Sequence, residues 1–153
     1  MNLPPNDLLV IGCGNPWRGD DGVGPYAARV FRRRGFAALE VHQLTPELAE
    51  PLSRAAFAVF IDADARLAPG QIRAEPVEES GSGVLDHHAS PGALLQLARQ
   101  VYGRAPQAVL IGIGAESYDP GRPLSSAVLH AVAALMERPL PIPFDRALAY
   151  NQV

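Results

Sequence analysis

The sequence contains no lysine, and each of its 13 basic residues is arginine. A Schiff-base lysine, a pyridoxal-phosphate lysine, a serine–lysine dyad and the phosphate-binding lysine of a P-loop are therefore all excluded. Cysteine is almost absent as well, since Cys13 is the only one. An internal disulfide and a cysteine-based structural zinc site are therefore excluded as well. The absence of disulfides is typical of proteins in the reducing cytoplasm.

Long apolar runs and an excess of positive charge are also missing. No apolar stretch reaches the roughly 18 residues of a transmembrane helix, and residues 1–7 lack the basic and apolar segments of a signal peptide, so we expect neither membrane insertion nor export. The net charge of −3 and the pI of about 5.8 disfavour nucleic-acid binding. With 153 residues, of which 48% are apolar, the chain is predicted to be a globular cytoplasmic protein.

Apolar runs alternate with helical patterns from one end of the chain to the other. Strands are predicted over 8–11, 39–44, 57–61, 71–77 and 108–113, and helices over about 23–36, 46–55, 91–102 and 126–136. Because most of the strands are apolar throughout, both faces of their sheet should be covered. The sequence predicts a three-layer α/β/α sandwich with a mostly parallel twisted sheet of about five strands. This single domain spans 1–138, and a proline-rich, irregular tail spans 139–153.

The loop after the first strand, 12–22, carries acids where a nucleotide-binding loop would carry other residues. It begins like a dinucleotide fingerprint, but the third glycine of G-x-G-x-x-G would fall on Trp17. It also has the glycine spacing of a P-loop, but Asp20 and Asp21 follow instead of lysine and serine or threonine. Asp20 alone is explained by the positive N-terminus of the next helix. The pair at the end of a strand favours cation or proton chemistry.

Two further candidate ligands follow other elements. Asp62 ends the strand over 57–61, and the carboxyl ends of parallel strands meet at one edge of a sheet. His87 and His88 precede the Ser-Pro start of the helix over 91–102, and spacing alone does not decide between the two histidines. Two carboxylates and one imidazole suit a borderline divalent ion and leave coordination positions open.

The loop resembles the signature G-x-G-N-x-x-x-x-D-D/E-x-x-G of the nickel-iron hydrogenase maturation endopeptidases, which residues 12–24 match at each fixed position. Further similarities to this family extend the resemblance from about Leu8 to Met136. They are Ile61-Asp62-Ala63 with Pro69-Gly70, His87-His88-Ala89-Ser90-Pro91 with Leu94-Leu95, Gly112, and Leu124-Ser125.

The resemblance implies a function and a set of metal-binding residues. Carried over by motif, the family's loop acid falls on Asp21, its strand-end aspartate on Asp62 and its histidine on His87, which lies three residues before Ser90. Some family members have glutamate in place of Asp21. These enzymes recognise nickel that is already inserted in the hydrogenase large-subunit precursor, and then remove the precursor's short C-terminal peptide. The expected partner is that precursor, and the expected cofactor is the nickel that it carries.

Several alternatives stay open at this point. Cys13, His87 and Asp62 could in principle form a thiol-protease triad, although the resemblance places no nucleophile at Cys13. The G-x-G-N-P opening also occurs in peptidyl-tRNA hydrolases, and the same acids and histidine would suit a non-catalytic nickel chaperone. The absence of H-E-x-x-H excludes a zincin. Trp17 either packs against its own loop or meets the substrate, while Glu116 and Asp119 are interpreted as turn residues.

Overall fold

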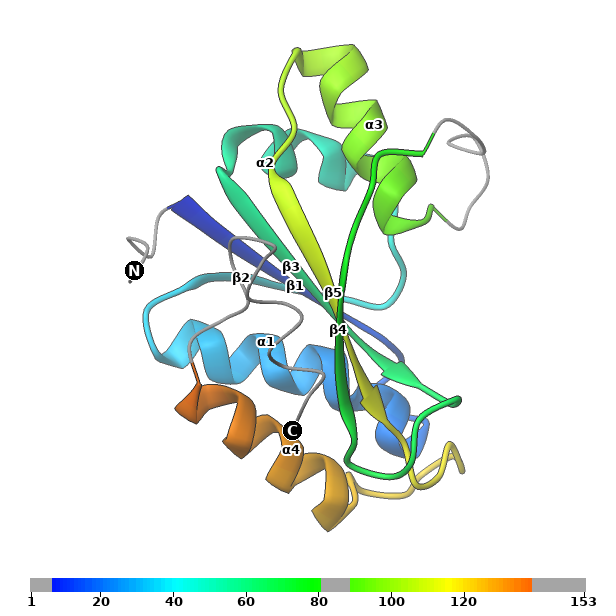
Figure 1. The fold of residues 1–153 in the computed structure, drawn as a ribbon. Helices are drawn as coiled ribbons and strands as arrows, with labels where there is room; N and C mark the ends of the chain where they lie inside the picture. The colour runs from blue at the N-terminus through cyan, green and yellow to red at the C-terminus, as the bar shows by residue number, and fades with distance from the viewer. Residues whose placement is uncertain (1–6, 81–88, 139–153) are drawn as a thin grey trace.

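The computed structural model describes residues 7–80 and 89–138 and shows one sheet covered by helices on both faces (Figure 1). Two predictions fall outside these residues: the irregular tail over 139–153, and the choice between His87 and His88 as a ligand. None of the helices in the described ranges has both the length and the apolar character needed to span a bilayer.

The sheet has five strands in the spatial order β2-β1-β3-β5-β4. Their bounds are Leu8–Cys13 for β1, Ala37–Val41 for β2, Phe57–Asp64 for β3, Ile72–Pro76 for β4 and Gln107–Gly114 for β5. Strands β2, β1, β3 and β5 are parallel, and the edge strand β4 runs antiparallel to β5. The predicted mostly parallel sheet of about five strands is therefore confirmed.

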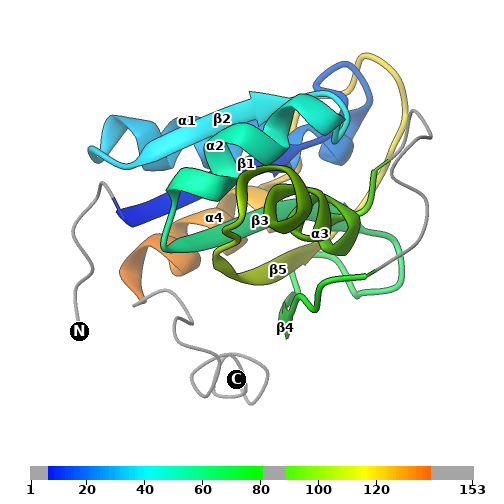
Figure 2. The same cartoon turned by 90° about the horizontal axis from the view of Figure 1, so that it is seen from above.

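Four α-helices form the two outer layers. Their bounds are Val23–Arg33 for α1, Ala49–Arg54 for α2, Pro91–Tyr102 for α3 and Ser126–Glu137 for α4. Helices α1 and α4 cover one face of the sheet, and α2 and α3 cover the other (Figures 1 and 2). The single helix predicted over 46–55 is a 3-10 turn, η3 (Pro46–Leu48), followed by α2.

Both faces of the sheet are apolar, because successive strand residues point to opposite sides. On β1, Val10 lies in the core beneath α1 and α4, whereas its neighbour Ile11 lies in the core beneath α2 and α3. On β3, Ile61 and Phe60 divide in the same way, and all four side chains are buried. This double burial explains why the strands are continuous apolar runs.

Local signals fix some element ends, and pairing fixes others. Helix α3 begins where the Ser90 hydroxyl accepts a hydrogen bond from the Ala93 amide at 3.1 Å, and ends before Gly103 at φ +77°. By contrast, β3 extends three residues beyond the predicted end. Its pairing with β5 continues as far as Asp64, opposite Gly114, so both Asp62 and Asp64 belong to the strand.

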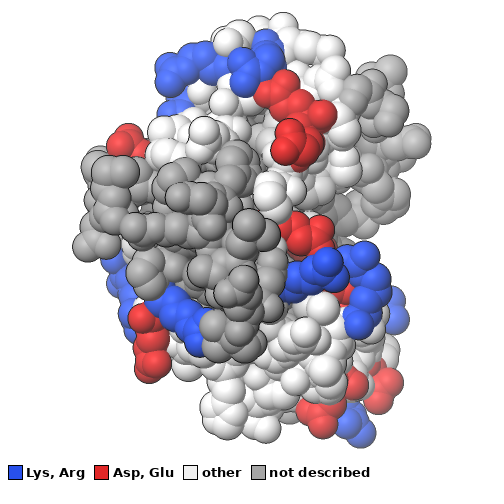
Figure 3. All heavy atoms as spheres, viewed as in Figure 1, with Lys and Arg blue, Asp and Glu red and all other residues white. Residues whose placement is uncertain are grey.

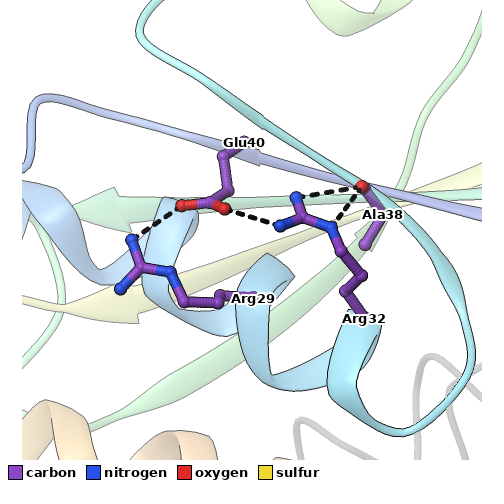
Figure 4. A network of polar contacts seen from close by, with 4 residues as sticks. All are labelled: Arg29, Arg32, Ala38 and Glu40. Atoms are coloured by element: carbon purple, nitrogen blue, oxygen red, sulfur yellow. Dashed lines mark hydrogen bonds and ion pairs between the residues drawn. The ribbon is translucent and has the colours of Figure 1, made fainter.

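Ion pairs fasten α1 to the edge strand β2 (Figure 4). Glu40 lies between Arg29 and Arg32, with both nitrogen–oxygen distances at 2.8 Å. The hydrogen bond from Arg29, together with that from Arg32, holds the pKa of Glu40 below its usual range. Arg32 also donates to the Ala38 carbonyl, so this arginine is more than a solvated helix end. Elsewhere on the face shown in Figure 3, arginines lie beside acids.

Candidate functional site

The structure brings Asp21 and Asp62 to the same edge of the sheet. Asp21 lies in the 3-10 turn η2 (Gly19–Gly22) between β1 and α1, and Asp62 lies near the carboxyl end of β3. Strands β1 and β3 are parallel neighbours, so these ends meet. The negative charges of both carboxylates help to raise the pKa of the Cys13 thiol at the end of β1. The predicted proximity of the two acids is therefore found in the structure.

Glycine is needed where α1 begins, because its first turn lies against the strand ends. A Cβ atom on Gly24 would lie 2.5 Å from the carbonyl oxygen of Ile61 and would overlap the backbone of Cys13. Gly14 has a φ of +149°, and a Cβ there would overlap the carbonyl oxygen of Asp21. These signature glycines allow the loop to carry its acid close to β3.

Asp21 is held by its own loop. Its Oδ2 atom accepts a hydrogen bond from the Asn15 amide at 2.8 Å, and its own amide donates to the Arg18 carbonyl at 3.1 Å. Within residues 7–80 and 89–138, no other hydrogen bond to this carboxylate is found. Since an ionised carboxylate can accept about four hydrogen bonds, most of its lone pairs are left for a cation or a substrate.

Asp62 is mostly buried, and this burial has an electrostatic consequence. Burial raises its pKa to about 6, and the negative charges of Asp21 and Asp64 add to the effect, although a backbone hydrogen bond at Ala63 opposes it. A carboxyl group with such a pKa exchanges its proton close to neutral pH. It can therefore serve either as an anionic ligand or as a general acid or base.

A metal ion at this edge needs more than the two acids. No group of three histidine, cysteine, aspartate or glutamate side chains that could hold a metal ion occurs in the described ranges. The third predicted ligand, His87, lies outside them. Two carboxylates supply hard oxygen donors but fill only part of the coordination sphere of a divalent ion. The donor chemistry thus suits a metal that brings ligands of its own.

Cys13 lies beside the acids but is unsuited to nucleophilic attack. Burial, followed by the charges of Asp62 and Asp21, raises the pKa of its thiol to about 12. Its Sγ atom donates to the His42 carbonyl oxygen at 3.6 Å. Because the thiolate is the nucleophilic form, a thiol that stays protonated at neutral pH argues against the thiol-protease triad.

Asp20 has a role that the sequence analysis missed. The carboxylate is 1% exposed and accepts hydrogen bonds from the Glu116 amide at 2.8 Å and from the Ser125 amide and hydroxyl at 2.7 Å each. Its amide donates to the Ser117 carbonyl. Burial alone would raise the pKa of Asp20, but the hydrogen bonds from Ser125 and Glu116 hold it below its usual range. Instead of capping α1, Asp20 ties the acidic loop to the segment before α4.

That segment, 115–125, borders the acidic loop and forms a pocket of about 320 Å³ with it. The pocket is lined by Asp20, Glu116, Ser117, Arg122, Pro123, Leu124 and Ser125. Burial, followed by the negative charges of Asp21 and Asp62, raises the pKa of the Tyr118 phenol in this segment. No motif marks Tyr118 in the sequence. Asp119 forms the predicted turn by accepting from the Arg122 amide.

The Asp20 contacts predict a large loss of stability when they are removed. We expect Asp20→Ala to lower the free energy of unfolding by about 3 kcal/mol, because three buried donors lose a charged acceptor. The control Asp119→Ala removes an exposed acid from the segment 115–125, which Asp20 contacts. It should change the free energy of unfolding by less than about 0.5 kcal/mol. Urea unfolding of both variants measures the difference, and equal losses would refute a stabilising role for the Asp20 hydrogen bonds.

The raised pKa of Asp62 predicts a pH-dependent stability in the metal-free protein. Its folded-state pKa of about 6 exceeds the ordinary value of 3.8, so between these two pH values the folded state binds more protons than the unfolded state. The stability contributed by this group is present at low pH and falls as the pH rises through that window. Relative to Asp62→Asn, the wild type should lose up to about 3 kcal/mol, measured by denaturation in EDTA. If the free energies of unfolding of the wild type and of Asp62→Asn change with pH in the same way, the raised pKa of Asp62 is contradicted.

Solved structures of hydrogenase maturation proteases share this fold. The NiFe hydrogenase maturation protease HybD from Thermococcus kodakarensis is 29% identical, with a TM-score of 0.65 over 85% of this chain and 94% of that chain. A hydrogenase 2 maturation peptidase from a Thaumarchaeota archaeon is 26% identical, with a TM-score of 0.62 over 85% and 93%. The hydrogenase maturating endopeptidase HybD from E. coli, 22% identical, has a TM-score of 0.67 over 85% and 87% and supports the fold alone.

The sequence matches no protein-family model and no curated protein. The structural similarity nevertheless covers 85% of the chain in both archaeal matches. The chain is therefore similar in fold, and at 29% and 26% identity in sequence, to solved hydrogenase maturation proteases.

Proposed function

We propose that this protein is an endopeptidase that removes the C-terminal peptide from the large-subunit precursor of a NiFe hydrogenase after nickel insertion. The observation that carries the proposal is the meeting of Asp21 and Asp62 at the carboxyl edge of the sheet, on a loop with the family signature. The maturation proteases that share its fold support the same reaction class.

In this proposal the nickel belongs to the substrate. Asp21 and Asp62, completed by His87, contact the nickel that the precursor presents, so the recognition site is complete only when a loaded precursor is bound. This requirement fits the chemistry of the two acids, which supply too few donors to hold an ion firmly by themselves. The protease thereby distinguishes a loaded precursor from an empty one.

Two chemical routes to cleavage are compatible with these residues. In one, a carboxylate activates the attacking water as a general base, and the pKa of Asp62, about 6, suits that role near neutral pH. In the other, the nickel polarises the scissile carbonyl or lowers the pKa of a bound water. Both routes place the scissile bond beside Asp21 and Asp62. We place the reaction in the cytoplasm, where the lone Cys13 stays reduced.

Cleavage of a purified precursor tests the proposal. The wild type should shorten the nickel-loaded large-subunit precursor at its C-terminus and leave the metal-free precursor intact, as measured by mass spectrometry. Asp21→Asn, Asp62→Asn and His87→Ala should each reduce the cleavage rate by more than about 100-fold, since losing even an outer-shell partner of a metal ligand costs 10–100-fold.

Two variants provide matched controls. Asp64→Asn alters an acid two residues from Asp62 whose carboxylate is already bound by Arg66 at 2.9 and 3.0 Å, and it should retain cleavage. His88→Ala should do the same if His87 is the ligand. If no precursor is cut while the protein alone binds nickel through these residues, the protein is a nickel chaperone and the protease proposal is wrong.

A further inference from the structure

Trp17 is a large apolar side chain displayed in water. It is 79% exposed, which settles the choice between packing against its own loop and facing outward. Burying an indole against a partner is favourable, so an exposed indole beside a functional site is available for contact with a bound substrate. Tryptophan is also among the residues that most often dominate the energy of protein–protein contacts.

The backbone around Trp17 is held in place on both sides. Its amide donates to Asn15 Oδ1 at 2.9 Å, and its carbonyl oxygen accepts from the Gly121 amide at 2.9 Å. Asn15 in turn donates its own amide to Asp21 at 2.8 Å. The indole is therefore presented by a fixed backbone rather than by a loose loop, which lowers the entropy cost of using it as a docking point.

The position of Trp17 connects it to the acids and to the neighbouring pocket. Through Asn15 it is two hydrogen bonds from the Asp21 carboxylate, and through Gly121 it adjoins the segment that lines the 320 Å³ pocket. The loop after β1 and the segment after β5 lie side by side in both views (Figures 1 and 2). Trp17 and the pocket therefore both adjoin the loop that carries Asp21.

A second aromatic side chain of the described residues is also exposed, but it lies far from the acids. Tyr102, 49% exposed, ends α3 just before β5 begins, which places it at the amino edge of the parallel strands, opposite the acids. Exposed aromatic side chains thus lie at both edges of the sheet, Trp17 at the carboxyl edge and Tyr102 at the amino edge. Of these two described aromatic residues, Trp17 is the one joined by hydrogen bonds to the acidic site, and this makes Tyr102 a suitable control.

We infer that Trp17 is a substrate-docking residue, whose indole packs against an apolar or aromatic side chain of the precursor close to the bond that is cut. This inference rests on the proposed function. It deepens that function by assigning part of the precursor recognition to the protein chain, in addition to recognition of the nickel. The pocket beside Trp17 provides space for a neighbouring side chain of the same precursor segment.

Steady-state cleavage of the nickel-loaded precursor tests this role. Trp17→Ala should raise KM about tenfold or more while kcat changes by less than about twofold, because a docking contact made equally in ground and transition states affects KM alone. Trp17→Phe keeps an aromatic ring and should recover KM to within about threefold. Tyr102→Ala should leave both constants unchanged. An unchanged KM for Trp17→Ala would overturn the inference and leave the proposed function standing.

Trp17 also provides a readout that does not depend on cleavage, because it is the only tryptophan in the chain. Protein labelled with 5-fluorotryptophan should give one ¹⁹F resonance, which we expect to shift on addition of unlabelled, nickel-loaded precursor. A resonance that stays at its free position while the precursor is bound or cleaved would overturn the inference. If wild-type protein cuts no precursor, the proposed function fails. The ¹⁹F signal still shows whether Trp17 contacts the precursor.

Discussion

The close approach of the first turn of α1 to the ends of β1 and β3 is the constraint on which the site depends. At Gly24 there is no room for a Cβ atom between the helix and the carbonyl oxygens of Cys13 and Ile61. This contact brings the turn before α1, with Asp21, next to the strand that carries Asp62. The buried Asp20 carboxylate fixes the opposite side of the same turn to the segment before α4. Of these two adjacent aspartates, Asp20 holds the loop in place, and Asp21 is the one that we propose contacts the nickel.

Burial then determines the chemistry of each group at this edge. The same desolvation that raises the pKa of Asp62 to about 6 raises that of the Cys13 thiol to about 12, so the carboxyl group can ionise near neutral pH while the thiol cannot. The repulsion between the carboxylates of Asp21 and Asp62 also favours the binding of a cation. A divalent ion between them removes the cost of placing two negative charges together. This electrostatic arrangement is what the proposed contact with a nickel ion held by the precursor requires.

The sequence predicts those parts of the molecule that short-range signals determine. Ser90, Pro91 and Gly103 mark both ends of α3, and the apolar runs correctly indicate strands buried on both faces. The sequence also places Asp21 and Asp62 at one edge of the sheet, because the strands that lead to them are parallel neighbours. The extension of β3 to Asp64 was missed because it depends on pairing with β5, about 50 residues away in sequence. The partners of Asp20, 96 and 105 residues distant, leave no local pattern, and the role of His87 stays a prediction.

The central claim is that these acids contact nickel held by the precursor. Nickel-edge X-ray absorption of the loaded precursor, recorded with and without one equivalent of this protein, tests it most directly. The account predicts that wild-type protein adds oxygen and imidazole-nitrogen scatterers to the nickel environment, and that the Asp21→Asn, Asp62→Asn double variant adds no carboxylate oxygen. A nickel spectrum that stays unchanged while the wild-type protein binds and cuts the precursor would contradict the account.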